Sequence, residues 1–93
     1  MASLIEAGSS AVNVVPADGK KFTLKEMYEL IGCSLVEMIS LRDGRTMWMD
    51  EEGKFKDPHV LNSLATTMLR EAGGAPGDYV AGTVLICTPG EVS

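Results

Sequence analysis

Apolar positions along the chain fall into short runs typical of strands and into two longer runs with the period of a helix. Gly8-Ser9-Ser10 between the first two strand-like runs predicts a hairpin. The last run is apolar at nearly every position, which predicts a strand buried on both faces, and Gly82 within it indicates a bulge or a close backbone approach. The expected strands are residues 3–7, 11–15, 34–41, 46–50 and 79–87.

The first helix is predicted from its cap. Thr23 and Glu26 form a capping box. The Thr23 side chain accepts a hydrogen bond from the backbone N–H of Glu26, and the Glu26 side chain accepts one from the backbone N–H of Thr23. Apolar side chains then recur on one face, and Gly32 follows where a left-handed residue ends a helix. The apolar positions of this face are Leu24, Met27, Tyr28 and Ile31.

The second helix is expected to begin at Asp57 as N-cap, with Pro58 at the first helical position. Its apolar face sweeps half of the helical wheel from Val60 to Ala72, and Gly73-Gly74 ends it. Asp43-Gly44 between two strands predicts a type I′ turn, which needs positive φ at both central residues. Residues 51–54 are expected to form another turn, followed by a short extended segment at 54–56.

This order of elements, β-β-α-β-β-α-β, predicts an α+β fold. The economical arrangement is a small two-layer sandwich, in which both helices cover one face of a mostly antiparallel sheet. The chain of 93 residues is one domain, residues 1–93, with a flexible tail at 89–93.

Composition and charge narrow the classes of function. The net charge of −5 disfavours general nucleic-acid binding, because an acidic surface repels phosphate. The absence of a long apolar run and of a leader-like start indicates neither membrane insertion nor secretion, so we expect a cytoplasmic protein. Cys33 and Cys87 with the single His59 do not make a zinc motif and are expected to be buried thiols.

Four residues are candidates for a binding site. Glu37 is expected among apolar neighbours, where a carboxylate either marks a site or is explained by an edge strand or an arginine partner. Trp48 with Met47 offers either an adaptable apolar contact surface or part of the core. Asn62 lies at the border of the helical apolar face, where its amide can bond either loop backbone, as a structural tie, or a ligand.

The sequence contains no recognisable motif for catalysis or for metal binding. Counted from Asp50 as a calcium loop, the glycine falls at position 4 and Leu61 at position 12, where a bidentate glutamate is required. There is no catalytic triad, no carboxylate pair and no phosphate-binding loop. We therefore expect a protein that is not an enzyme and that uses no cofactor and no metal.

The order of several motifs resembles a family of small domains encoded mostly by bacteriophages and mobile elements, catalogued as a domain of unknown function. The resemblance is carried by residues 16–27 (PADGKKFTLKEM), 31–37 (IGCSLVE) and 50–54 (DEEGK), by Asn62, and by residues 80–85. The family pattern has Gly-Gly-Tyr-Ile-Glu where this chain has Gly32-Cys33-Ser34-Leu35-Val36-Glu37. A surface built on that tyrosine is therefore not expected here.

The resemblance implies a phage accessory protein in the cytoplasm of an infected bacterium but supplies no activity. The first hypothesis is an inhibitor or adaptor that binds a host protein, with proteins of antiviral defence as candidates. The second is a binder that sequesters a nucleotide signal in pockets between the subunits of a homo-oligomer. The third is an inert virion or housekeeping role.

Overall fold

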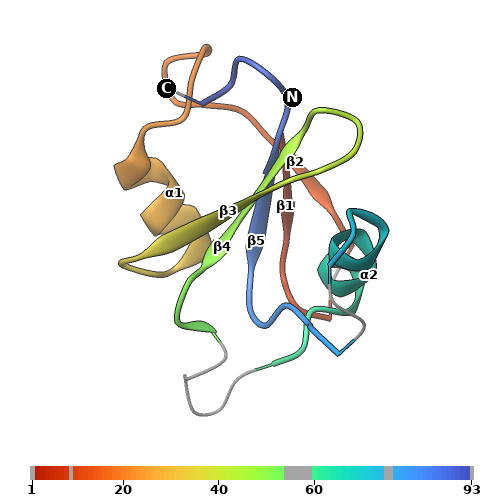
Figure 1. Ribbon diagram of the computed structural model, residues 1–93. Helices are drawn as coiled ribbons and strands as arrows, with labels where there is room; N and C mark the ends of the chain where they lie inside the picture. The colour runs from red at the N-terminus through yellow and green to blue at the C-terminus, as the bar shows by residue number, and fades with distance from the viewer. Residues whose placement is uncertain (1, 9, 54–59, 75–76, 93) are drawn as a thin grey trace.

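The computed structural model describes residues 2–8, 10–53, 60–74 and 77–92. They form one five-stranded antiparallel sheet in the order β2-β1-β5-β4-β3, with two helices (Figure 1). The α+β class and the order of elements are confirmed. The elements are β1 (Ala2–Ile5), β2 (Val12–Val14), α1 (Leu24–Ile31), β3 (Val36–Ser40), β4 (Thr46–Asp50), α2 (Ser63–Glu71) and β5 (Val84–Cys87).

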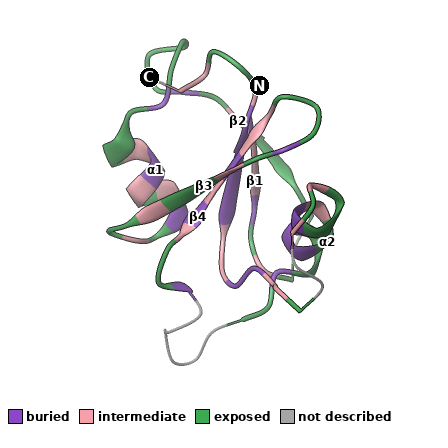
Figure 2. Cartoon of the chain, viewed as in Figure 1, coloured by how far each residue is buried: buried purple, intermediate pink, exposed green. Residues whose placement is uncertain are grey.

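The two helices cover opposite faces of the sheet, which differs from the expected two layers (Figure 1). All four residues of β5, the central strand, are buried: Val84 and Ile86 pack with α2, and Leu85 and Cys87 pack with α1. A strand with apolar side chains on both faces must be covered by another element on each face. The burial predicted for residues 79–87 is therefore consistent with three layers, in which the sheet lies between the two helices. Figure 2 shows this gradient, from a buried β5 to a mostly exposed β3 at the sheet edge.

Two hydrophobic cores result, one on each side of the sheet. The α2-side core holds Ile5, Leu41, Met47, Met49, Ala65, Leu69, Val80, Val84 and Ile86. The α1-side core holds Ala2, Phe22, Met27, Ile31, Leu85 and Cys87. Among the described residues, neither helix is long and apolar enough to span a bilayer.

Helix α1 confirms its predicted boundaries. The Thr23 hydroxyl accepts a hydrogen bond from the Glu26 backbone N–H at 3.2 Å, and the Glu26 carboxylate accepts one from the Thr23 N–H at 3.1 Å. Gly32 ends the helix in the left-handed region with a φ of 79°. Local sequence alone sets both ends of this helix.

Helix α2 begins at Ser63 with Asn62 as N-cap, so the prediction of an Asp57 cap was wrong. Leu61 instead forms a β-bridge with Ala81, and the Gly82 N–H donates to the Val60 carbonyl at 2.9 Å. These tertiary bonds hold residues 60–61 extended, which overrides their helical pattern. The expected short extended segment, Asp57, Pro58 and His59 lie outside the described residues.

The turn between β3 and β4 is not type I′. Within this turn Gly44 has a positive φ, 89°, whereas Asp43 does not, since no non-glycine residue in the described part of the chain has a positive φ. The Gly44 N–H donates to the Leu41 carbonyl at 3.2 Å and the Leu41 N–H donates to the Arg45 carbonyl at 2.8 Å. This is the three-residue loop built on a type I turn with a left-handed glycine, which spares Asp43 the strained conformation.

The C-terminal segment, predicted to be a flexible tail, makes defined contacts in the structure. Phe22 forms a parallel bridge with Val92, and the Phe22 N–H donates to the Glu91 carbonyl at 2.6 Å. Val92 packs against the α1-side core. Residues 88–92 therefore close one end of the sheet over Phe22.

Candidate functional site

Of the four candidate residues, Met47 lies farthest from solvent. It is fully buried in the α2-side core, because β4 alternates its side chains between the two faces of the sheet. A side chain without exposed surface cannot form a docking surface. The predicted contact surface of Met47 with Trp48 is therefore wrong, and Met47 is a core residue.

Trp48 points to the opposite face and is half-buried against the α1-side core. Its indole N–H donates to the Thr46 hydroxyl at 3.0 Å, which satisfies its polar edge within β4. The strand register places Trp48 between Leu85 of β5 and Met38 of β3. Met38 is 47% exposed, so the apolar row that begins in the core reaches solvent at the β3 edge.

Strand β3 is an edge strand whose outer backbone groups are unpaired among the described residues. The Glu51 N–H donates to the Leu35 carbonyl at 3.1 Å, and the Leu41 N–H to the Arg45 carbonyl at 2.8 Å. Because paired residues alternate along an antiparallel ladder, Glu37 and Ile39 bond to β4 as well. The backbone groups of Val36, Met38 and Ser40 therefore point away from the sheet.

Glu37 is exposed on this edge strand, which explains how a carboxylate can alternate with apolar residues there. It lines a cavity of about 220 Å³ together with Asp50, Glu51 and Tyr79. In the described part of the chain, no group of three or more acidic, histidine or cysteine side chains is placed to hold a metal ion. Glu37 thus gives β3 one acidic position, and Asp50 and Glu51 lie next to β3 on its inner side.

Asn62 is 1% exposed, and the structure shows the structural tie rather than the binding role among its two alternatives. Its amide nitrogen donates to the Ile5 carbonyl at 3.0 Å and to the Gly82 carbonyl at 2.8 Å. Its amide oxygen accepts from the Ala65 N–H at 3.1 Å, which caps α2. Both amide N–H groups and the amide oxygen therefore have protein partners in a buried setting.

A cavity that sequence reasoning missed lies beside α2. Its volume is about 480 Å³, within the range of ~300–1,000 Å³ of small-molecule sites. Polar residues of one helical face form one wall, and Tyr79 and Leu61 contribute to the rest. The sequence signal was available: Ser63, Thr66, Thr67 and Arg70 recur at i, i+3, i+4 and i+7. The apolar positions of the same segment form the stronger periodic pattern.

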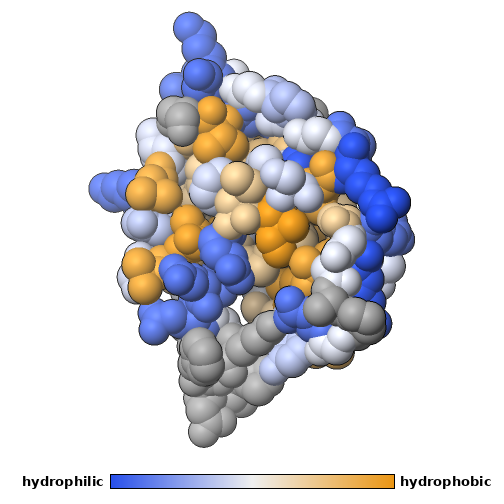
Figure 3. Space-filling view, viewed as in Figure 1, coloured by the Kyte–Doolittle hydropathy of each residue, from blue (hydrophilic) through white to orange (hydrophobic). Residues whose placement is uncertain are grey.

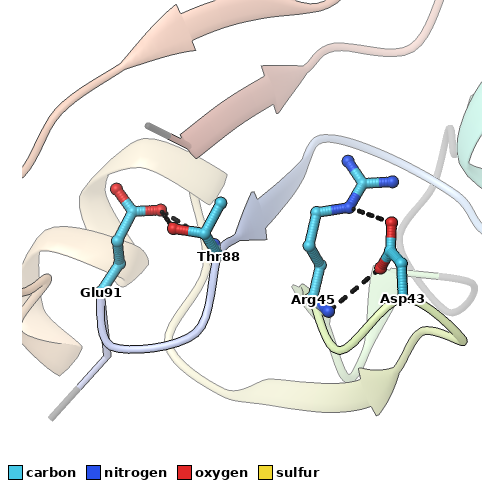
Figure 4. A network of polar contacts seen from close by, with 4 residues as sticks. All are labelled: Asp43, Arg45, Thr88 and Glu91. Carbon is cyan, nitrogen blue, oxygen red and sulfur yellow. Dashed lines mark hydrogen bonds and ion pairs between the residues drawn. The ribbon is translucent and has the colours of Figure 1, made fainter.

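Two further polar pairs stabilise the opposite end of the sheet (Figure 4). Asp43 accepts from the backbone N–H of Arg45 at 3.1 Å and from its guanidinium at 2.7 Å, and these contacts lower the pKa of the Asp43 carboxyl. Burial raises the pKa of Glu91, but bonds from the hydroxyl and N–H of Thr88 outweigh it, so the net shift is downward. Both pairs fix local turns; the cavity next to Arg45 has a volume of only about 150 Å³.

The two thiols differ in exposure. Cys87 is fully buried in the α1-side core, and burial raises its pKa to about 11. Cys33 is half-buried, and neither thiol forms a disulfide. A buried thiol with a raised pKa is a poor nucleophile, so Cys87 acts as a core residue.

Comparison with known proteins gives a family without an activity. No curated protein and no solved structure matches the chain. One family model matches residues 2–92, almost the whole chain. The protein therefore belongs to the family described as Domain of unknown function (DUF3846).

Proposed function

We propose that the protein acts without catalysis, by binding an extended segment of a host protein along the free edge of β3. The observation that carries this proposal is the row of outward backbone groups at Val36, Met38 and Ser40, which can pair with an added strand. Natural proteins usually block long free edges with charge, proline or a covering element. Here Met38 and Leu35 are each 47% exposed beside that edge, which favours pairing.

The chemistry of the edge indicates the kind of segment that fits. An added strand would place alternate apolar side chains beside Met38 and continue the row that contains Trp48. Its other side chains would lie beside Glu37, which is exposed on β3 itself, so lysine or arginine at that position would be complementary. Figure 3 shows apolar side chains at the surface over the strands and near α1, with polar side chains around them.

The biological setting is part of this proposal. We place the protein in the cytoplasm of a bacterium infected by a phage that encodes it, where the partner would be a host protein, with proteins of antiviral defence as candidates. A small acidic domain of a family without assigned activity is compatible with this role. Disabling a host protein by strand addition requires no chemistry of the domain itself.

The test is capture of a host protein by the tagged domain from bacterial lysate. In Met38→Pro, proline removes an outward N–H that β4 does not use, so the sheet should persist while strand addition is blocked. We expect the captured protein to be lost with Met38→Pro and kept with Val15→Ala, a control at an apolar residue that is 64% exposed and lies away from β3. If Met38→Pro stays folded by circular dichroism and retains the same protein, the β3 proposal is wrong.

A second candidate function is favoured by the cavity beside α2, which can hold a small molecule such as a nucleotide signal. The sequence-based hypothesis placed such pockets between subunits, whereas this cavity is formed within one chain. The second candidate function predicts that denaturing the purified domain releases a bound small molecule rather than a protein. Mass spectrometry of that extract separates the two candidates.

A further inference from the structure

The polar wall of the cavity beside α2 is held in a fixed position against the segment that carries Tyr79. The Thr66 hydroxyl accepts from the Val80 N–H at 2.9 Å and donates to the Val80 carbonyl at 3.4 Å. This bond pair ties the middle of α2 to residues 79–80. The two walls are therefore preorganised relative to each other, which reduces the entropy cost of binding.

One end of this wall carries a positive charge available for a ligand. Arg70 is exposed in the last turn of α2, and it makes no ion pair in the described part of the chain. A guanidinium binds phosphate or carboxylate through two parallel N–H bonds. The neighbouring cavity, beyond Tyr79, is bordered by Glu37 and Asp50, so an anion is directed to the Arg70 side.

The remaining wall suits a ring with hydroxyl groups. Tyr79 lines the cavity with an aromatic side chain, and Leu61 adds an apolar surface that is 50% exposed. Ser63 contributes a hydroxyl on the same helical face as Arg70, two turns away, at a separation of about 10 Å along the helix axis. A ligand that meets all of these groups needs an anion at one end and a polar ring system at the other.

We propose that this cavity binds a phosphorylated ring compound of the nucleoside monophosphate class. The phosphate lies on Arg70, the base lies against Tyr79 and Leu61, and the sugar hydroxyls face the hydroxyl groups of α2. The proposal rests on the second candidate function and names its ligand class. It is independent of the β3 edge.

The test uses adenosine 5′-monophosphate as the probe and measures binding by calorimetry to the full chain. Adenosine, which lacks the phosphate, and ribose 5-phosphate, which lacks the base, are expected to bind at least about tenfold more weakly, because each loses one of the two main contacts. Arg70→Gln is expected to weaken the nucleotide by about tenfold or more. Arg42→Gln removes the same charge at an exposed residue outside this cavity and should leave binding unchanged.

Two outcomes overturn the proposal. Nucleotide binding that Arg70→Gln and Arg42→Gln reduce equally would show that general charge, not this cavity, holds the phosphate. Absence of nucleotide binding to the wild-type chain would reject the ligand class. In the second case, a compound of another class released from the denatured domain would preserve the small-molecule function, whereas an empty extract would reject both.

Discussion

Replacement of Asn62 by alanine tests whether the position of α2 depends on one side chain. The substitution removes three hydrogen bonds, two to the Ile5 and Gly82 carbonyls and one from the Ala65 N–H. Each bond contributes about 1 kcal/mol net, and buried groups left without partners raise the cost further. We expect the free energy of unfolding to fall by about 3–5 kcal/mol.

That loss is a large part of the stability of a domain of this size, which is about 5–14 kcal/mol at typical values per residue. The melting temperature should fall by roughly 12–40 °C, since each kcal/mol corresponds to about 4–8 °C in small domains. Urea unfolding followed by Trp48 fluorescence and by circular dichroism gives both the free energy and a check for two-state behaviour.

A serine at position 62 separates the two roles of the asparagine. Serine keeps an oxygen that can cap α2 but lacks the amide donor for the two carbonyls, so its expected cost is about 2–3 kcal/mol. Asn13→Ala, at an exposed position on β2, is the matched control and should change stability by no more than about 0.5 kcal/mol. If Asn62→Ala costs no more than Asn13→Ala, the buried network is not what positions the helix.

Three further predictions concern packing, thiol chemistry and acid stability. Gly53→Ala places a Cβ 2.8 Å from the Ala81 carbonyl oxygen, so we expect a loss of about 1–3 kcal/mol in urea unfolding; a variant as stable as wild type would contradict this close approach. In the native protein Cys33 should react with iodoacetamide while Cys87 reacts only on unfolding, as peptide mass spectrometry would show; equal native rates would refute the burial argument. Bonds from the N–H groups of Ala17 and then Thr23 hold the pKa of Glu26 below 4.5 in the folded state. The unfolded state therefore binds more protons, so this stabilisation is present above pH 4.5 and is lost below it; Glu26→Gln should give a shallower loss of stability on acidification, and an unchanged slope would exclude the contribution.

The sequence was most informative where a few neighbouring residues decide the structure. Thr23, Glu26 and Gly32 set both ends of α1 through local hydrogen bonds and one left-handed residue, and all three were identified. Helix α2 was misplaced at its start because Asp57-Pro58 is a good local start signal, whereas the observed start depends on bonds from Asn62 to residues 5 and 82. Such long-range bonds leave no periodic pattern in the sequence.

The candidate site was less predictable for a related reason. Alternation along β4 shows that Met47 and Trp48 face opposite sides, but it does not show that a helix covers each side. Met47 is completely buried on the face that α2 covers, whereas Trp48 is half-buried on the face that α1 covers. The same uncertainty concealed the cavity beside α2, since its Tyr79 wall comes from residues expected to be part of a strand.

Residues 16–27, 31–37, 50–54 and 62 contain two physically different kinds of residue. Thr23, Gly32, Gly53 and Asn62 cap helices, adopt positive φ or allow close backbone approach, so they build the scaffold. Glu37 lies exposed on the free edge strand β3, where a solvated carboxylate adds little to folding. Binding of a basic strand would give Glu37 a role that the fold does not. Neutralising Glu37 should therefore weaken partner capture in a salt-dependent way while leaving the stability of the domain almost unchanged.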